Sequence, residues 1–264
     1  MKMNNKVVWI TGASSGIGAA LAGEYSKLGT RLILSSRNLE SLETVRSQCR
    51  FPDKIRILEM DLEQYEILSE SVDKAVGFFG KIDVLINNAG ISQRSFAADT
   101  DLAVDKKIID INYFGTISLT KGLIPHFREQ NGGHFVVVTS VVGKIGTPLR
   151  SSYSASKHAL HGFFDSLRAE LFEDNIKVTL ICPGYVRTNV SINAVTGSGK
   201  KQGTMDHATE NGLDPNEFAK KAIRAIRNER QELVIGGLKE RLAVWVKRFF
   251  PLILSRMIRK IKVT

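Results

Sequence analysis

The repeated alternation of short apolar strands with amphipathic helices restricts the fold of this chain more than any other feature. Apolar runs predict strands at 6–10, 31–35, 55–60, 84–87, 134–138, 177–181 and 232–235. Helical periodicity predicts helices at 17–27, 39–48, 63–79, 104–128, 153–173 and 215–227. Such alternation is typical of a parallel sheet with helices on both faces. We therefore expect an α/β protein built on a doubly wound parallel sheet.

Length and composition agree with one large catalytic domain in an aqueous compartment. The chain has 264 residues, of which 43% are hydrophobic and 24% charged, as in globular proteins rather than disordered or membrane-spanning ones. Its two cysteines, Cys49 and Cys182, form no metal-like pair and no disulfide framework, which indicates a reducing compartment. The first apolar run leads directly into a glycine turn, so no secretory signal is expected. These observations predict a cytoplasmic protein.

A glycine-rich turn follows the first predicted strand and opens the first helix. Gly12, Gly16 and Gly18 would let backbone amides and the helix N-terminus approach a pyrophosphate. Simple tight packing is the alternative explanation for such a turn. The strand and helix on either side favour a dinucleotide site in a Rossmann-type sheet.

Tyr153 and Lys157 are the strongest candidates for catalytic chemistry. They are four residues apart, so they share one face of a helix. A neighbouring ammonium lowers the pKa of a phenol, which is ordinarily near 10, and makes Tyr153 a plausible proton donor and acceptor. The pair alone could also be an ordinary amphipathic helix start. Ser140, directly after an apolar strand, and the glycine turn favour the catalytic interpretation.

Several motifs occur together in a fixed order. The stretch 11–18 reads Thr-Gly-Ala-Ser-Ser-Gly-Ile-Gly, and 87–90 reads Asn-Asn-Ala-Gly. The other members of the set are Asp61, Asn112, Ser140, Tyr153 with Lys157, Pro183 with Gly184, and Thr188. From about residue 6 to 235 the chain closely resembles the short-chain dehydrogenase/reductase family.

This resemblance implies hydride transfer between a nicotinamide and a carbonyl or alcohol carbon. Tyr153 would donate the proton in reduction or accept it in oxidation, and Ser140 would hydrogen-bond the substrate oxygen. Lys157 would hold the nicotinamide ribose and lower the pKa of Tyr153. Asn112 would anchor a water in the proton relay. The resemblance also implies these cofactor contacts: Gly12, Ser14, Ser15, Gly16, Ile17, Gly18, Arg37, Asp61, Leu62, Asn88, Ala89, Gly90, Tyr153, Lys157, Pro183, Gly184, Val186 and Thr188.

The end of the second predicted strand bears on the choice of cofactor. NAD-selective sheets commonly place an acidic residue there, and NADP-selective sheets place a basic one. No acid occurs between Thr30 and Asn38, whereas Arg37 offers a fork of donors suited to a phosphate. The alternative is that Arg37 is an ordinary solvated arginine of a loop. We predict that the cofactor is NADP(H).

Two further features have simpler explanations. His158 and His161 share a helix but lack nearby acidic or cysteine partners in the sequence, so we predict no metal site. The apolar side chains of Phe163, Phe164, Leu167 and Leu171 suit core or subunit packing. By analogy with the family, this helix would contribute to a homodimer or homotetramer.

Residues 189–212 form a long polar stretch, which we interpret as a mobile substrate lid, with a plain disordered connection as the alternative.

The expected catalytic domain spans residues 1–238. The tail, 239–264, carries eight basic residues and one acid, and therefore +7 of the total net charge of +10. Because the charge is localised, nucleic-acid binding by the main body is not expected.

The tail repeats apolar residues at helical intervals among its basic ones. Two surfaces could cover these apolar residues: a membrane or the protein itself. Leu242, Trp245, Val246, Phe249, Ile253, Met257 and Ile261 would form an apolar stripe. The longest uncharged run, 249–255, is far too short to span a bilayer, and Pro251 divides the helix. A basic amphipathic helix can instead lie among lipid headgroups. The stripe could equally pack on its own domain or on a second subunit.

This tail and the sequence at 153–158 place the chain nearer the hydroxysteroid-dehydrogenase-like branch, which acts on lipophilic carbonyls or alcohols. The expected function is an NADP(H)-dependent oxidoreductase of a lipophilic substrate. The enzymatic alternative is a 3-oxoacyl-thioester reductase that receives an acidic carrier protein. Binding of nucleic acid by the tail is a further alternative, and the intact Ser140, Tyr153 and Lys157 argue against a non-catalytic regulator.

Overall fold

A computed structural model describes residues 3–259 and contains a sheet of seven parallel strands, as predicted. The strand order is β3-β2-β1-β4-β5-β6-β7, so the direction of winding reverses between β1 and β4. The strands are β1 (Val7–Thr11), β2 (Arg31–Ser36), β3 (Ile55–Glu59), β4 (Val84–Asn87), β5 (Gly133–Val138), β6 (Ile176–Pro183) and β7 (Glu232–Ile235).

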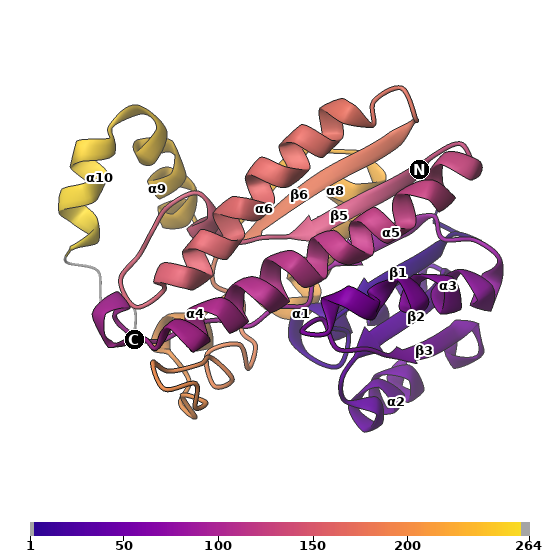
Figure 1. Ribbon diagram of the computed structural model, residues 1–264, viewed down its shortest axis with the longest axis horizontal. Helices are drawn as coiled ribbons and strands as arrows, with labels where there is room; N and C mark the ends of the chain where they lie inside the picture. The colour runs from indigo at the N-terminus through magenta and orange to yellow at the C-terminus, as the bar shows by residue number, and fades with distance from the viewer. Residues whose placement is uncertain (1–2, 260–264) are drawn as a thin grey trace.

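Helices cover both faces of this sheet (Figure 1). One face packs on α1 (Gly16–Lys27), α2 (Leu39–Gln48) and α8 (Pro215–Arg227). The other packs on α3 (Leu68–Phe79), α5 (Gly115–Glu129) and α6 (Ser151–Glu170).

Strand β1 contributes to both halves of the core. Val8 and Ile10 belong to the first apolar cluster, and Val7 and Trp9 belong to the second. All four are fully buried, and successive side chains of a strand point to opposite faces. Because both faces of this central strand are buried, its sequence is a continuous apolar run and does not alternate between apolar and polar residues.

Two predicted helices are interrupted in the structure. The helix expected at 63–79 starts at Leu68, after a short 3₁₀ turn at Tyr65–Ile67. The helix expected at 104–128 consists of α4 (Leu102–Ile109), a π-helical turn at Asp110–Phe114, and α5. π-helical turns are rare and frequently mark functional sites. This one contains Asn112.

The segment 189–212 folds against the body of the protein. It pairs with the loop after β4 through a bridge between Gln93 and Val195, and it includes the short helix α7 (His207–Glu210). Ser191, Ala194 and Asp206 in this segment are buried. Buried contacts hold the segment in this conformation, and its role as a mobile substrate lid stays a prediction.

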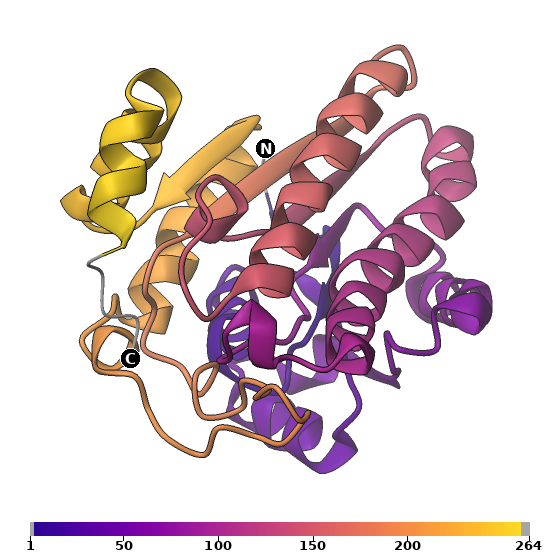
Figure 2. The same ribbon diagram turned by 60° about the vertical axis from the view of Figure 1, so that its left-hand side comes forward.

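Two helices form the described part of the tail, α9 (Leu238–Phe249) and α10 (Pro251–Ile258). They make a hairpin at one end of the molecule, on the same side as the segment 189–212 (Figures 1 and 2). Leu254 is buried against Val141 and Ile145 of the main domain. Within residues 3–259, the helices are too short or too polar for any of them to cross a bilayer. Lys260, Ile261 and Lys262, which the sequence assigns to the tail, lie outside the described residues.

Candidate active site

A cavity of about 460 Å³ opens at the carboxyl ends of the central strands, where the winding of the sheet reverses. Ligands of open α/β sheets bind at this position. Of the site residues predicted from sequence, all but Gly18 and Asn112 line the cavity. Those present are Gly12, Ser14, Ser15, Gly16, Ile17, Arg37, Asp61, Leu62, Asn88, Ala89, Gly90, Ser140, Tyr153, Lys157, Pro183, Gly184, Val186 and Thr188.

Gly18 lies behind the cavity and allows α1 to pack closely on the turn. A Cβ at position 18 would lie 2.2 Å from the carbonyl oxygen of Gly12, so no side chain fits there. Gly12 has φ of +64°, and a Cβ there would lie 2.8 Å from Cα of Ala89. Both positions require glycine. The first turn of α1 carries no acidic residue, and the side chain of Ser15 makes no capping hydrogen bond, so its amides fit a pyrophosphate.

Hydrogen bonds join this turn to the end of β4. The hydroxyl of Thr11 accepts from the backbone amides of Asn88 and Ala89 at 3.0 and 3.1 Å. The side-chain amide of Asn88 donates to the carbonyl oxygens of Thr11 and Gly12 at 3.0 and 3.2 Å. Asn88 therefore fixes the spacing between the two walls of the cofactor groove.

Asn112 holds the loop after β4 to α6 without lining the cavity. Its Oδ1 accepts from the amide of Ile91 at 2.8 Å, and its Nδ2 donates to the Ile91 carbonyl at 2.9 Å. The same Nδ2 lies 3.0 Å from the hydroxyl of Ser156. The π-helical turn places this fully buried amide where both segments can be reached. Its predicted water contact stays a prediction.

Tyr153, Lys157 and Ser140 line the same cavity and lie close together beyond the end of β5. Strand β5 ends at Val138, which places Ser140 just beyond the sheet, where its hydroxyl hydrogen-bonds the Tyr153 phenol. Lys157 is buried on α6 and donates to the carbonyl oxygen of Val138 at 3.0 Å. Its Nζ lies 5.8 Å from the centre of the Tyr153 ring. A proton donor, a hydroxyl and an amine therefore share one small volume.

Burial dominates the protonation of this group. It lowers the pKa of Lys157 to about 8 and raises the pKa of Tyr153 above its usual value. The groups that oppose burial at Tyr153 are the cation of Arg150, the hydroxyl of Ser140 and the cation of Arg94. The two arginines therefore act on this phenol as cations, and the predicted lowering of its pKa by Lys157 stays a prediction.

Gln93 is a positioning residue that the sequence did not reveal. Its Oε1 accepts from the backbone amides of Ser152 and Tyr153 at 2.9 and 3.2 Å, and these amides belong to the first turn of α6. Its Nε2 lies 3.2 Å from the hydroxyl of Ser151. Gln93 thus caps the helix that carries Tyr153 and fixes where the helix begins.

Arg94 and Arg150 share one carboxylate, that of Asp206. Nε of Arg94 donates to Oδ2 of Asp206 at 2.9 Å, and Nη2 of Arg94 contacts the same oxygen. Nη2 of Arg150 is 3.6 Å from this oxygen, and Nε of Arg150 has no partner among the described residues. All three side chains are buried, which leaves one positive charge in excess beside Tyr153. The cluster also anchors the segment 189–212 to the active site.

His161 has partners that the sequence argument did not find. Sγ of Cys182 lies 3.8 Å from its Nε2, and Oε2 of Glu232 lies 3.6 Å from its Nδ1. These partners approach opposite nitrogens of the ring, and Lys144 holds Glu232 at 2.6 Å. Burial lowers the pKa of His161 to about 4 and raises that of Cys182 to about 11. A neutral ring and a thiol suit packing, and the absence of a metal stays a prediction.

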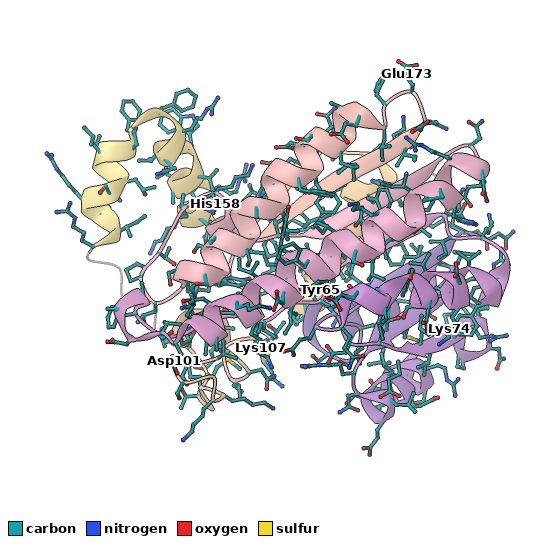
Figure 3. The ribbon with its side chains drawn as sticks, in the orientation of Figure 1. Tyr65, Lys74, Asp101, Lys107, His158 and Glu173 are labelled. Atoms are coloured by element: carbon teal, nitrogen blue, oxygen red, sulfur yellow. The ribbon has the colours of Figure 1, made fainter. Side chains whose placement is uncertain are left out.

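His158 and the apolar side chains of α6 follow the simpler expectation. His158 lies on α6 (Figure 3). Its Nδ1 is 2.8 Å from the carbonyl oxygen of Ser154, one turn earlier on the same helix. Phe164, Leu167 and Leu171 are buried in the core, and Phe163 packs against it.

A groove for a dinucleotide and a buried proton donor open into the same cavity. Reduction of a carbonyl group adds a hydride to its carbon and a proton to its oxygen, so the cofactor and the proton donor must face the same bond. This arrangement is that of an oxidoreductase with a doubly wound fold.

Comparison with known proteins agrees with this class. Residues 6–198 match the family model described as short chain dehydrogenase. Dehydrogenase/reductase SDR family member 7B of Xenopus tropicalis is 43% identical over 258 residues, covering 95% of this chain and 84% of the relative. A Drosophila melanogaster SDR family protein 7-like is 38% identical, covering 95% and 78%. The chain belongs to the short-chain dehydrogenase/reductase family.

Solved structures show the same fold. A short-chain dehydrogenase from Streptomyces avermitilis superposes with a TM-score of 0.83 at 25% identity, covering 96% of both chains. A Burkholderia cenocepacia short chain dehydrogenase in complex with NADP gives 0.79 at 22% identity, covering 98% of this chain and 99% of that one. A Burkholderia phymatum relative in complex with NAD gives 0.80 at 23%, covering 98% and 93%.

Proposed function

We propose that this protein is an NADP(H)-dependent reductase, reversibly a dehydrogenase, of a lipophilic carbonyl compound. The observation that carries the proposal is the convergence of Ser140, Tyr153 and Lys157 in the same cavity as the dinucleotide groove. Bound nicotinamide supplies the hydride in reduction and accepts it in oxidation.

The chain's own groups manage the proton. The phenol of Tyr153 donates its proton to the carbonyl oxygen, and the raised pKa keeps that proton in place at neutral pH. The hydroxyl of Ser140 donates a hydrogen bond to the same oxygen as negative charge develops on it. Lys157 would hold the ribose of the cofactor, because its Nζ lies in the cavity wall between Tyr153 and Gly90. In oxidation Tyr153 accepts the proton instead.

The end of β2 supports selectivity for NADP(H). Ser35, Ser36, Arg37 and Asn38 line the cavity there and carry no acid. Nη1 of Arg37 is 3.9 Å from the carboxylate of Asp61, and 58% of the arginine side chain is exposed. So long an ion pair leaves the guanidinium able to bind a ribose phosphate through charge-assisted hydrogen bonds.

Apolar side chains near the reacting groups support a lipophilic substrate. Ile91, Ile111, Val138, Val186 and Val190 line the cavity together with the catalytic residues. Ligand pockets of this kind combine an apolar wall with a few polar groups that fix orientation. These side chains would contact the apolar part of a lipophilic substrate, while polar groups of the same cavity hold the cofactor and the carbonyl oxygen.

A carbonyl panel tests the proposal. Steroids, retinoids, aliphatic ketones and a carrier-linked 3-oxoacyl thioester are each incubated with NADPH and with NADH, and oxidation of the cofactor is followed by its absorbance. We expect turnover of lipophilic ketones with NADPH, and at least ~10²-fold slower turnover by Tyr153→Phe. Turnover of the carrier-linked thioester alone would assign a 3-oxoacyl-thioester reductase instead. Preference for NADH would overturn the cofactor assignment.

We also propose a homodimer or homotetramer assembled through α5 and α6. Aromatic side chains gather beside these helices. Tyr65 of the 3₁₀ turn (Figure 3) stacks on Phe114 of the π-helical turn at 5.4 Å, and Tyr113 of the same turn meets Phe163 of α6 at 6.2 Å. In the single chain, Phe114 is 39% exposed. An aromatic side chain that is buried in a subunit interface would be exposed in this way before the subunits assemble. Light scattering of wild type and Phe114→Glu tests this, and a monomeric wild type would refute it.

A further inference from the structure

We propose that α9 and α10 form a docking surface for an anionic lipid membrane and hold the mouth of the active-site cavity close to the lipid. The docking surface consists of the exposed apolar side chains of the two helices and the basic side chains around them. This inference does not depend on the reaction that the enzyme catalyses.

The apolar part of the docking surface is exposed on both helices. On α9, Leu238, Leu242, Trp245 and Phe249 repeat at intervals of three and four residues, which places them on one face of the helix. On α10, Ile253 and Met257 follow the same rule. The exposed set is Leu238, Leu242, Trp245, Phe249, Phe250, Leu252, Ile253 and Met257, each at least 46% exposed. The Trp245 ring lies 5.1 Å from Phe249 and 5.7 Å from Phe250, so the aromatic groups form one cluster.

The opposite side of the hairpin is already occupied by the protein itself. Leu254 is buried with Val141 and Ile145, and Ala243, Val244, Val246 and Ile258 pack against this cluster. Packing on the chain's own domain therefore accounts for the inner side of the hairpin and leaves the outer apolar side uncovered. Uncovered apolar patches on this scale mark sites of interaction with another surface.

Charge indicates what covers the outer side. Lys239, Arg241, Lys247, Arg248, Arg256 and Arg259 against Glu240 give the described part of the tail a net charge of +5. If a second copy of the chain docked on this surface through its own tail, two segments of net charge +5 would face each other. Their repulsion opposes self-association. An anionic partner is favoured instead. Trp and Phe beside Lys and Arg are the residues that settle at a lipid headgroup layer.

The length of the helices fixes the mode of attachment. Helix α9 has 12 residues and α10 has 8, so each is shorter than the roughly 20 residues needed to span the hydrocarbon layer. The hairpin can only lie in the plane of the membrane surface.

Contact with the membrane would orient the active site. Val141 and Ile145, on which the hairpin packs, follow directly after Ser140 in the chain. The hairpin and the segment 189–212, whose Asn189, Val190 and Asn193 line the cavity, lie on the same side of the molecule (Figure 2). A membrane held by α9 and α10 would thus be near the cavity entrance, where an apolar substrate dissolved in lipid could enter.

Flotation with vesicles tests the docking surface. Full-length protein is mixed with vesicles of phosphatidylcholine alone or with about 30% phosphatidylserine, at low and at high salt. We expect flotation with the anionic vesicles at low salt and at least tenfold less binding at high salt or without phosphatidylserine. Failure to float with anionic vesicles at low salt overturns the proposal.

Point variants are preferable to deletion of the tail, because deletion would uncover Val141 and Ile145. We expect the double variant Trp245→Glu and Phe249→Glu to bind anionic vesicles at least tenfold more weakly. Phe172→Glu, which changes a residue 72% exposed outside the hairpin, should bind like wild type. Equal binding by the double variant and wild type would refute the apolar contact.

The basic contribution has its own matched pair. Lys247→Glu with Arg248→Glu should weaken binding at least tenfold, since each cation near an anionic surface contributes about fivefold. Lys221→Glu with Arg224→Glu makes the same change of charge on the exposed side of α8. Thermal unfolding within a few degrees of wild type checks that each variant is folded. If light scattering shows that the hairpin variants dissociate a dimer while flotation is unchanged, a second copy covers this surface and the proposal fails.

Discussion

Arg150 precedes Tyr153 by three residues at the start of α6, and its buried guanidinium is the strongest influence opposing the effect of burial on the Tyr153 phenol. Burial raises the pKa of this phenol, and the cation lowers it by favouring the phenolate. The fold therefore uses a residue outside the Ser140, Tyr153 and Lys157 set to tune the proton donor.

Replacing Arg150 should change the pH profile of the reaction. In the oxidative direction activity rises with pH as the phenol ionises, so Arg150→Gln should move that rise to higher pH. Arg150→Lys retains a cation and should move it less. The measurement is kcat/KM for alcohol oxidation as a function of pH. A rise at the same pH in wild type and Arg150→Gln would show that Arg150 does not act on the phenol.

Tyr153→Phe should lower kcat by at least ~10²-fold, because the ring stays and the transferable proton is lost. Binding of NADPH, titrated by nicotinamide fluorescence, should stay within about twofold of wild type. Tyr113→Phe, which removes a phenol from the aromatic contact with Phe163, is the control and should keep its activity. Reduction by Tyr153→Phe at more than about a tenth of the wild-type rate would exclude Tyr153 as the donor.

Arg37→Ala should weaken NADPH binding by ~10 to 150-fold and leave NADH binding nearly unchanged, because only NADPH carries the additional phosphate. Arg46→Ala, which removes an arginine paired with Glu43 on α2 outside the cavity, serves as the control. Fluorescence titration of both cofactors makes the comparison. Equal losses for the two cofactors would assign Arg37 a structural role.

Asp206→Asn should loosen the segment 189–212, because two buried arginines would lose the carboxylate that they share. Breaking a buried ion pair costs roughly 3 to 5 kcal/mol, part of which local opening of the segment would relieve. We expect faster cleavage within 189–212 in limited proteolysis. Asp214→Asn, which breaks the exposed pair with Arg187, should be cleaved like wild type.

Acid should destabilise the protein through His134. Burial lowers the pKa of this histidine from 6.5 to about 4, so between these values the unfolded chain binds a proton that the folded chain does not. The contribution of His134 to the free energy of unfolding should therefore be unchanged above about pH 6.5 and fall by roughly 3 kcal/mol as the pH drops to about 4. Urea unfolding across this range measures the slope.

His134→Gln removes this titration and should make the dependence of stability on pH less steep, while His161, whose pKa burial also lowers to about 4, keeps contributing to it. Glutamine can still hydrogen-bond Thr179, which lies 2.8 Å from Nε2 of the histidine. The partly exposed His158 supplies the matched variant, His158→Gln, which should keep the wild-type slope. An unchanged slope in His134→Gln would contradict the assignment.

The parallel sheet, the order of its elements and most of the residues that line the cavity could be predicted from the amino-acid sequence. These features depend on local chemistry: apolar runs form buried strands, glycines permit the turn at 12–18, and a spacing of four places Tyr153 and Lys157 on one helix face. Because parallel strands must align at their carboxyl ends, motifs far apart in the chain meet there without further information.

Tertiary structure alone decided the contacts that depend on which segments approach one another. Arg94 and Asp206 are 112 residues apart, and nothing in either stretch indicates the other. The π-helical turn at Asn112 follows from its ties to Ile91 and Ser156, which override the plain helical pattern at 104–128. The partners of His161 also come from distant segments of the chain. The tail has an inner and an outer side because one side of its helices packs on the main domain. Periodicity shows that a helix has two faces, but only packing decides which of them is covered.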